Sequence, residues 1–120
     1  MLTSENEEKY IKGWQRRRKN KKIKLKQKKE KAMKKAKKIS DILKTNYGIT
    51  KVILFGSLAE DKFWENSDID LAITGLSEKK YLKAFGEATD IASPFKVDLI
   101  IIEKAPEYLV KKINNRGIEI

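Results

Sequence analysis

Three aspartates and a glycine-serine pair are the residues of this 120-residue chain best suited to chemistry. Asp68 and Asp70 are separated by one residue, so in a strand they point the same way, roughly 6.5 to 7 Å apart at Cα. Their carboxylates can then converge on shared hard cations, and Asp98 can join them if its strand is a neighbour. Without cations, three clustered carboxylates would raise one another's pKa. With two Mg²⁺ ions they would form a clamp for in-line phosphoryl chemistry.

Gly56 and Ser57 are separated from Asp68 by ten residues and fit the same chemistry. A glycine turn that leads into a helical segment near Leu58 would expose backbone N–H groups and a hydroxyl, which together make a phosphate cradle. Alone, a glycine-serine pair is an ordinary end of a strand, and Asp-x-Asp is often a solvated strand opening. The prediction therefore depends on the combination.

The composition excludes several other kinds of site. The chain has no Cys and no His, which removes disulfides, thiolate metal sites, the usual zinc sites and histidine-based triads. No apolar run approaches the roughly 18 residues of a membrane span, and the chain opens on polar residues rather than on a signal peptide. We therefore expect a cytoplasmic protein without membrane contact.

Apolar patterning predicts the elements that must position these residues. Three strands are expected at Lys51–Phe55, Asp68–Ile73 and Phe95–Ile102, because these runs are β-branched or alternate strictly. Two helices are expected, one at roughly Glu78–Thr89 with Ser77 as its cap, and one that begins at Pro106 and ends near Asn114 and Asn115, before Gly117. A short edge strand would follow at 117–120. The predicted fold class is α+β, a small mixed sheet flanked by helices.

The positive charge is concentrated in a basic arm, residues 9–44. This arm holds 18 Lys and Arg and 2 acids, a net charge of +16, whereas residues 45–120 hold 10 bases and 12 acids, a net charge of −2. The arm lacks Pro and is rich in good helix formers. We expect one long basic helix over residues 1–45, followed by a domain over residues 46–120.

The two halves of that helix differ. Apolar residues recur at three and four residues from Ala32 to Leu43, which predicts a stripe packed on the core. A helix from Ser4 to Lys44 would be about 60 Å long, so part of it must protrude, bend or lie on another surface. Four interpretations of the free part stay open: a solvated helix, a contact to RNA or DNA backbone, self-association into a homo-oligomer, and docking on a protein.

Gly56-Ser57, Asp68-x-Asp70 and a later strand with Asp98 together resemble the minimal nucleotidyltransferase (MNT) branch of the DNA polymerase β-like nucleotidyltransferase superfamily. The resemblance covers roughly residues 47–102. It implies a nucleotidyltransferase fold and transfer of a nucleoside monophosphate from an NTP, such as ATP, to a hydroxyl with release of pyrophosphate.

The resemblance also implies roles for single residues. Asp68 and Asp70 would ligate two Mg²⁺ ions, Asp98 would complete the site and help activate the acceptor hydroxyl, and Gly56 with Ser57 would hold the triphosphate. Many MNT proteins resemble antitoxins that pair with HEPN toxins and can adenylylate a tyrosine on them. The basic helix is not part of the shared core.

Three functions follow as alternatives. The first is a Mg²⁺-dependent nucleotidyltransferase that acts on a macromolecular partner such as a HEPN-type toxin. The second is a module that binds a toxin or RNA through the basic helix without catalysis. The third is an enzyme that modifies a small hydroxylated molecule.

Overall fold

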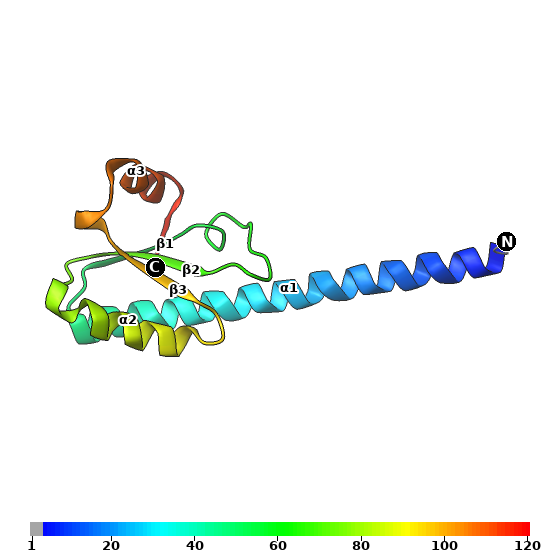
Figure 1. Cartoon of the computed structure of the whole chain (residues 1–120), viewed down its shortest axis with the longest axis horizontal. Helices are drawn as coiled ribbons and strands as arrows, with labels where there is room; N and C mark the ends of the chain where they lie inside the picture. The colour runs from blue at the N-terminus through cyan, green and yellow to red at the C-terminus, as the bar shows by residue number, and fades with distance from the viewer. Residues whose placement is uncertain (1–3) are drawn as a thin grey trace.

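The chain forms three α-helices, four strands and one 3₁₀ turn in the computed structural model, which describes residues 4–120 and their side chains from Glu7 on (Figure 1). In chain order the elements are α1 (Ser4–Tyr47), β1 (Lys51–Phe55), β2 (Ile69–Thr74), α2 (Glu78–Ala92), β3 (Val97–Ile101), η1 (Ile102–Lys104), α3 (Glu107–Arg116) and β4 (Ile118–Glu119). The predicted α+β class is confirmed.

The four strands make one mixed sheet in the order β3-β2-β1-β4. β1 runs antiparallel to both β2 and β4, and β2 runs parallel to β3. α2 makes the crossover between the two parallel strands, as a parallel pair requires. The sheet therefore brings the strand that follows Asp68 directly beside the strand that carries Asp98.

Helices cover both faces of this sheet (Figure 1). α1 and α2 pack side by side on one face, and their contacting positions are largely alanines, which let two helices approach closely. The buried apolar residues of these two helices are Ala32, Ala36, Ile39, Leu43, Ala84, Ala88 and Ala92. On the other face, Ile113 of α3 packs against Ile53, Phe55 and Ala72. The larger core thus lies between the sheet and α1 with α2.

α1 extends far beyond the sheet, so the molecule measures 68 × 29 × 19 Å. Residues 7–24 of this helix are exposed, apart from Gly13, which is half-buried. The helix ends where Gly48 adopts a φ of +65°, a left-handed conformation that stops a helix at little cost in glycine. Within residues 4–120, no helix is long and apolar enough to cross a membrane.

Some local predictions were wrong in detail. Ser77 lies at the N-cap of α2, but its hydroxyl makes no capping bond, and its carbonyl accepts from the Lys80 amide instead. Phe95 precedes β3 because its amide donates to the Ala92 carbonyl in the turn after α2. Ile102 follows β3, since its carbonyl already accepts from Ala105 in the 3₁₀ turn.

Candidate active site

Asp70 and Asp98 are direct neighbours across the parallel pair β2 and β3. Adjacent strands lie about 4.8 Å apart, and paired residues point to the same face. The intervening residues Ile69, Leu71 and Leu99 are buried in the larger core, which leaves both carboxylates on the opposite face, the one that α3 partly covers. Asp70 is half-buried and Asp98 is exposed.

The electrostatics of Asp70 reflect this crowding. Burial, and then the neighbouring charges of Asp98 and Asp68, raise the pKa of the Asp70 carboxyl to about 6, while Lys112 acts in the opposite direction. Burial and like charges both disfavour the ionised form. The positive charge of Lys112 therefore does not fully balance the negative charge of the clustered carboxylates.

Gly56 lies against the Asp70 carboxylate at the end of β1. Its φ is +78°, and a Cβ at this position would lie 3.1 Å from the Asp70 Cγ and would overlap with Oδ2. Phe55, the preceding residue, is the register partner of Asp70. A glycine is needed here for two reasons, since the backbone is left-handed and the carboxylate occupies the space of a side chain.

After Gly56 the chain makes a tight turn in place of the helix that the sequence predicted. The Glu60 amide donates to the Gly56 carbonyl at 3.0 Å, and the Lys62 amide donates to the Ser57 carbonyl at 2.8 Å. The turn does not continue as a helix because Asp61 adopts a left-handed φ of +57°.

The turn nevertheless presents donors. The amides of residues 57–59 donate no hydrogen bond to any group within residues 4–120. Ser57 itself is only half-buried. Successive unpaired amides beside a glycine are suited to phosphate oxygens.

Asp68 lies one residue before β2 and is exposed. The strand begins at Ile69 because the Ile69 amide donates to the Lys96 carbonyl at 2.9 Å. Asp68 is still near enough to raise the pKa of Asp70. We call Asp68, Asp70, Asp98 and Gly56 the aspartate edge.

The aspartate edge offers the donors that magnesium prefers, although it is not a finished metal site. Within the described part of the chain, no group of three or more acidic side chains is gathered so that it could hold a metal ion as it stands. Mg²⁺ binds through one or two carboxylates together with waters and substrate phosphates, and seldom through a complete protein cage. The Asp70–Asp98 pair supplies two such carboxylates. The raised pKa of Asp70 shows that its ionised form would gain from a nearby cation.

Two basic residues of α3 flank this edge and were missed by sequence reasoning. Lys112 lowers the pKa of Asp70, and Arg116 pairs with Glu60 of the turn at 3.3 Å. The packing of Ile113 and Leu109 on the sheet places α3 here. The sequence predicts the helix, but it contains no local signal for the face that this helix covers.

A hollow of about 290 Å³ adjoins the aspartate edge. It is lined by Glu65, Asn66, Ser67, Asp68, Pro94, Phe95 and Lys96. The loop before it is held by the Ser67 hydroxyl, which accepts from the Trp64 amide at 3.0 Å. The hollow combines an aromatic ring, a lysine and Asp68, and so has room and groups for part of a nucleotide.

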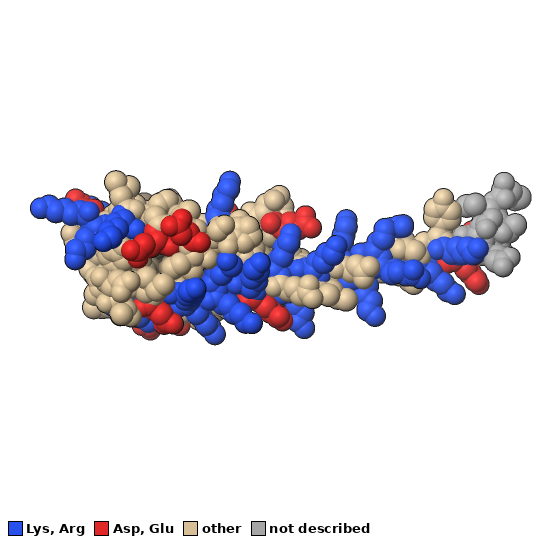
Figure 2. All heavy atoms as spheres, turned by 90° about the horizontal axis from the view of Figure 1, so that it is seen from below, with Lys and Arg blue, Asp and Glu red and all other residues tan. Residues whose placement is uncertain are grey.

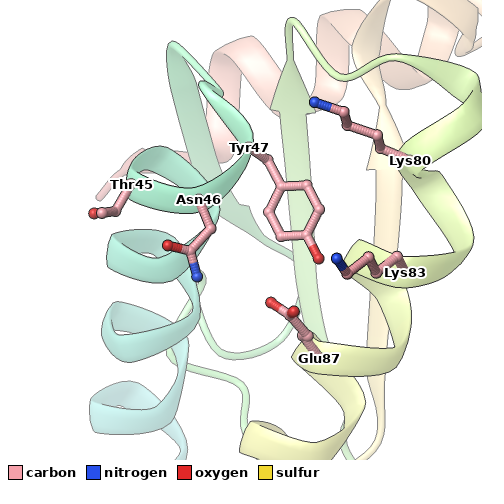
Figure 3. A pocket seen from close by; sticks show the side chains of 6 residues that line it. All are labelled: Thr45, Asn46, Tyr47, Lys80, Lys83 and Glu87. Atoms are coloured by element: carbon pink, nitrogen blue, oxygen red, sulfur yellow. The ribbon is translucent and has the colours of Figure 1, made fainter.

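A second hollow, of about 570 Å³, lies between the end of α1 and α2 (Figure 3). The Tyr47 hydroxyl points into the gap toward Glu87 and Lys83. It is buried and has no hydrogen-bond partner among the described residues. Burial and the Glu87 carboxylate raise the pKa of Tyr47. None of the residues predicted to do chemistry lines this hollow.

Comparisons with known proteins agree with this geometry. A family model described as polymerase beta, nucleotidyltransferase matches residues 37–120. A Methanocaldococcus jannaschii protein that bears the name of a protein adenylyltransferase is 31% identical over 62 residues, which are 52% of this chain and 47% of that protein. The chain thus spans about half the length of that relative.

Solved structures share the fold. A chain of a toxin-antitoxin complex with AMP-PNP has a TM-score of 0.61 and 25% identity, over 70% of both chains. A chain of the complex between a tri-AMPylated HEPN toxin and an MNT antitoxin from Shewanella oneidensis has a TM-score of 0.57 and 22% identity, over 73% of this chain and 70% of that one. A protein described as a minimal nucleotidyltransferase gives 0.64 and 19%, over 77% and 95%. These structures confirm the predicted fold, and the family model confirms the predicted resemblance to the polymerase β-like nucleotidyltransferases.

Proposed function

Because the chain belongs to the polymerase beta nucleotidyltransferase family, we propose that it transfers AMP from ATP to a hydroxyl group of a protein partner in a Mg²⁺-dependent reaction. The observation that carries this proposal is the register of Asp70 against Asp98, with Gly56 pressed against the Asp70 carboxylate. Paired carboxylates beside unpaired amides are what an enzyme of phosphoryl chemistry needs to hold cations and triphosphate together.

Each residue of the aspartate edge then has a role. Asp68, Asp70 and Asp98 would hold the metal, which when bound would neutralise charge on the triphosphate and on the leaving pyrophosphate. The amides and hydroxyl after Gly56 would bind phosphate oxygens. Lys112 and Arg116 lie on the α3 side of the site, where positive charge supports the same anionic substrate.

In the reaction, the acceptor oxygen would attack the α-phosphorus in line with the bridging oxygen to the β-phosphorus. The new P–O bond forms as that bridging bond breaks, and pyrophosphate leaves with the bonding electrons. The acceptor proton would pass to Asp98, whose exposed carboxylate can be reached from solvent. Positioning and charge, rather than covalent chemistry, would supply the rate enhancement.

A protein acceptor is supported by the relatives and by the openness of the site. One relative bears the name of a protein adenylyltransferase, and one structural neighbour is a complex that contains a tri-AMPylated HEPN toxin. Asp68 and Asp98 are both exposed, so a side chain of a large partner can reach the aspartate edge. We therefore propose a HEPN-type toxin as the acceptor and this chain as its antitoxin.

The test is transfer of label from α-³²P-ATP, with Mg²⁺, to the protein encoded by the neighbouring gene, which the proposal expects to be of the HEPN type. We expect labelling by the wild type and its loss in Asp70→Ala and Asp98→Ala. Asp90→Ala is the matched control, because Asp90 is an exposed aspartate of α2. Labelling that survives Asp70→Ala, or the absence of labelling with the wild type, would refute the proposal.

A further inference from the structure

The N-terminal part of α1 forms a basic rod, residues 9–24, that projects from the body of the protein. It holds nine Lys and Arg and no Asp or Glu. Its side chains are exposed, and Lys and Arg project from both sides of it in Figure 2. The family match begins only at residue 37, so the rod lies outside the part shared with the nucleotidyltransferases.

The positive charge of the basic rod, and of the helical turns that follow it up to residue 38, is hardly balanced by acidic side chains of the same molecule. Residues 9–38 contain 17 Lys and Arg and one acid, Glu30. Among them only Lys29 forms an ion pair, with Asp61, within the side chains of residues 7–120. Like charges three and four residues apart destabilise a helix by about 0.2 to 0.5 kcal/mol per pair. Such a helix gains most from a polyanion outside the chain.

The positive side chains surround the rod. At about 100° per residue, its nine Lys and Arg leave no gap wider than about 60° around the helix axis. A flat acidic surface of a protein would need charge on one side only. A groove with a phosphate row on each wall would use charge on two opposite sides of the helix at once.

We propose that the basic rod binds duplex DNA by lying in the major groove. A helix with side chains is about 10 to 12 Å across, and the B-DNA major groove is about 12 Å wide. The deep, narrow major groove of duplex RNA does not admit a helix. The rod is about 24 Å long, enough to reach phosphates on both walls of the groove.

The far end of the rod adds apolar groups suited to a groove floor. Tyr10, Ile11 and Trp14 are exposed by 69%, 55% and 56% and lie on one side of the helix. The Arg18 guanidinium lies over the Trp14 ring, 5.3 Å from its centroid, in a cation–π contact. Apolar side chains that face the floor of the major groove can contact thymine methyl groups. This proposal rests on residues other than those of the proposed transfer reaction.

The experiment measures the anisotropy of a labelled 20-bp DNA duplex against the full chain between 50 and 300 mM KCl. We expect log K to fall with log[KCl] with a slope of about −4 to −5, equivalent to about five phosphates. The test variant replaces Lys12, Arg16, Lys19 and Lys22 with Gln. It keeps helix propensity, and we expect its slope to become shallower by about 3 to 4.

The matched control removes the same charge from the body, by replacing Lys51, Lys79, Lys80 and Lys83 with Gln. We expect its slope to change by less than about 1. Circular dichroism checks that both variants stay folded. The proposal is overturned if the rod variant binds like the wild type. It is also overturned if duplex RNA, single-stranded RNA or polyglutamate of matched charge competes as well as the DNA does.

Discussion

The aspartate edge and the basic rod both concentrate one sign of charge, but they hold it differently. Asp70 and Asp98 are fixed by strand register, and Gly56 is fixed against one of them. The rod carries its charge on long exposed side chains that are positioned only by the helix. Charge in fixed positions is suited to chemistry at one phosphorus atom, whereas charge spread along a rod is suited to a repeating polyanion.

The largest expected effect is a separation of the two activities. Asp70→Asn should lower nucleotide transfer by about 10³-fold or more, because it removes a proposed metal ligand, and should leave the salt dependence of DNA binding unchanged. The four-residue rod variant should do the opposite. Nucleotide transfer and DNA binding should be measured for both variants. If either variant loses both activities, the aspartate edge and the basic rod do not act separately.

Truncation of one isoleucine in each half of α1 compares the packed half of the helix with the rod. Ile39→Ala should cost about 2 to 4 kcal/mol of unfolding free energy, since Ile39 is fully buried in the larger core. Ile23→Ala should cost less than about 0.5 kcal/mol, because Ile23 is exposed. Urea unfolding monitored by circular dichroism measures both. Equal costs would mean that the rod packs on something in solution.

A pair of glycine substitutions sharpens the account of the aspartate edge. Gly48→Ala should cost about 1 kcal/mol of stability because Gly48 has a positive φ, and Gly56→Ala should cost more, because a clash adds to the same backbone strain. Only at Gly56 does the new methyl group meet the Asp70 carboxylate, while nothing lies within 4 Å at Gly48. Transfer activity should therefore collapse in Gly56→Ala alone. Full activity of Gly56→Ala would contradict the assigned geometry.

The smallest expected effect is on the pH dependence of stability. The pKa of Asp70 is raised in the folded chain to about 6 from its ordinary 3.8, so ionised Asp70 disfavours folding. This penalty is fully present above pH 6 and is lost as the pH falls below about 4. Asp70→Asn should thus stabilise the chain at pH 7.5 by about 1 to 2 kcal/mol, after allowance for a half-exposed site. Denaturant midpoints at pH 7.5 and pH 4 measure the difference, which should vanish at pH 4.

Much of the fold follows from local pattern. Alternation places Asp70 and Asp98 opposite the buried residues of their strands, and the spacing from Ala32 to Leu43 matches the buried side of α1. The division of the chain at residue 45, the cytoplasmic location and the metal-binding roles of Asp68, Asp70 and Asp98 stay predictions.

What the sequence could not supply depends on contacts between distant segments. Lys112 acts on Asp70, and Arg116 pairs with Glu60 of the neighbouring turn, because α3 packs on the sheet through Ile113 and Leu109. The turn after Gly56 replaces a predicted helix because Asp61 adopts a left-handed φ of +57°. Neither feature can be predicted from the spacing of residues in the sequence.

The central claim is that Asp70 and Asp98 hold one metal-nucleotide complex beside Gly56. The most direct test is NMR of the ¹⁵N-labelled chain with AMP-PNP and Mn²⁺ in place of Mg²⁺, because a paramagnetic ion broadens nearby amide signals. We expect selective broadening at residues 56–59, 68–70 and 97–99, and its loss in Asp70→Asn. Broadening that is confined to other residues, or that persists in Asp70→Asn, would contradict the claim.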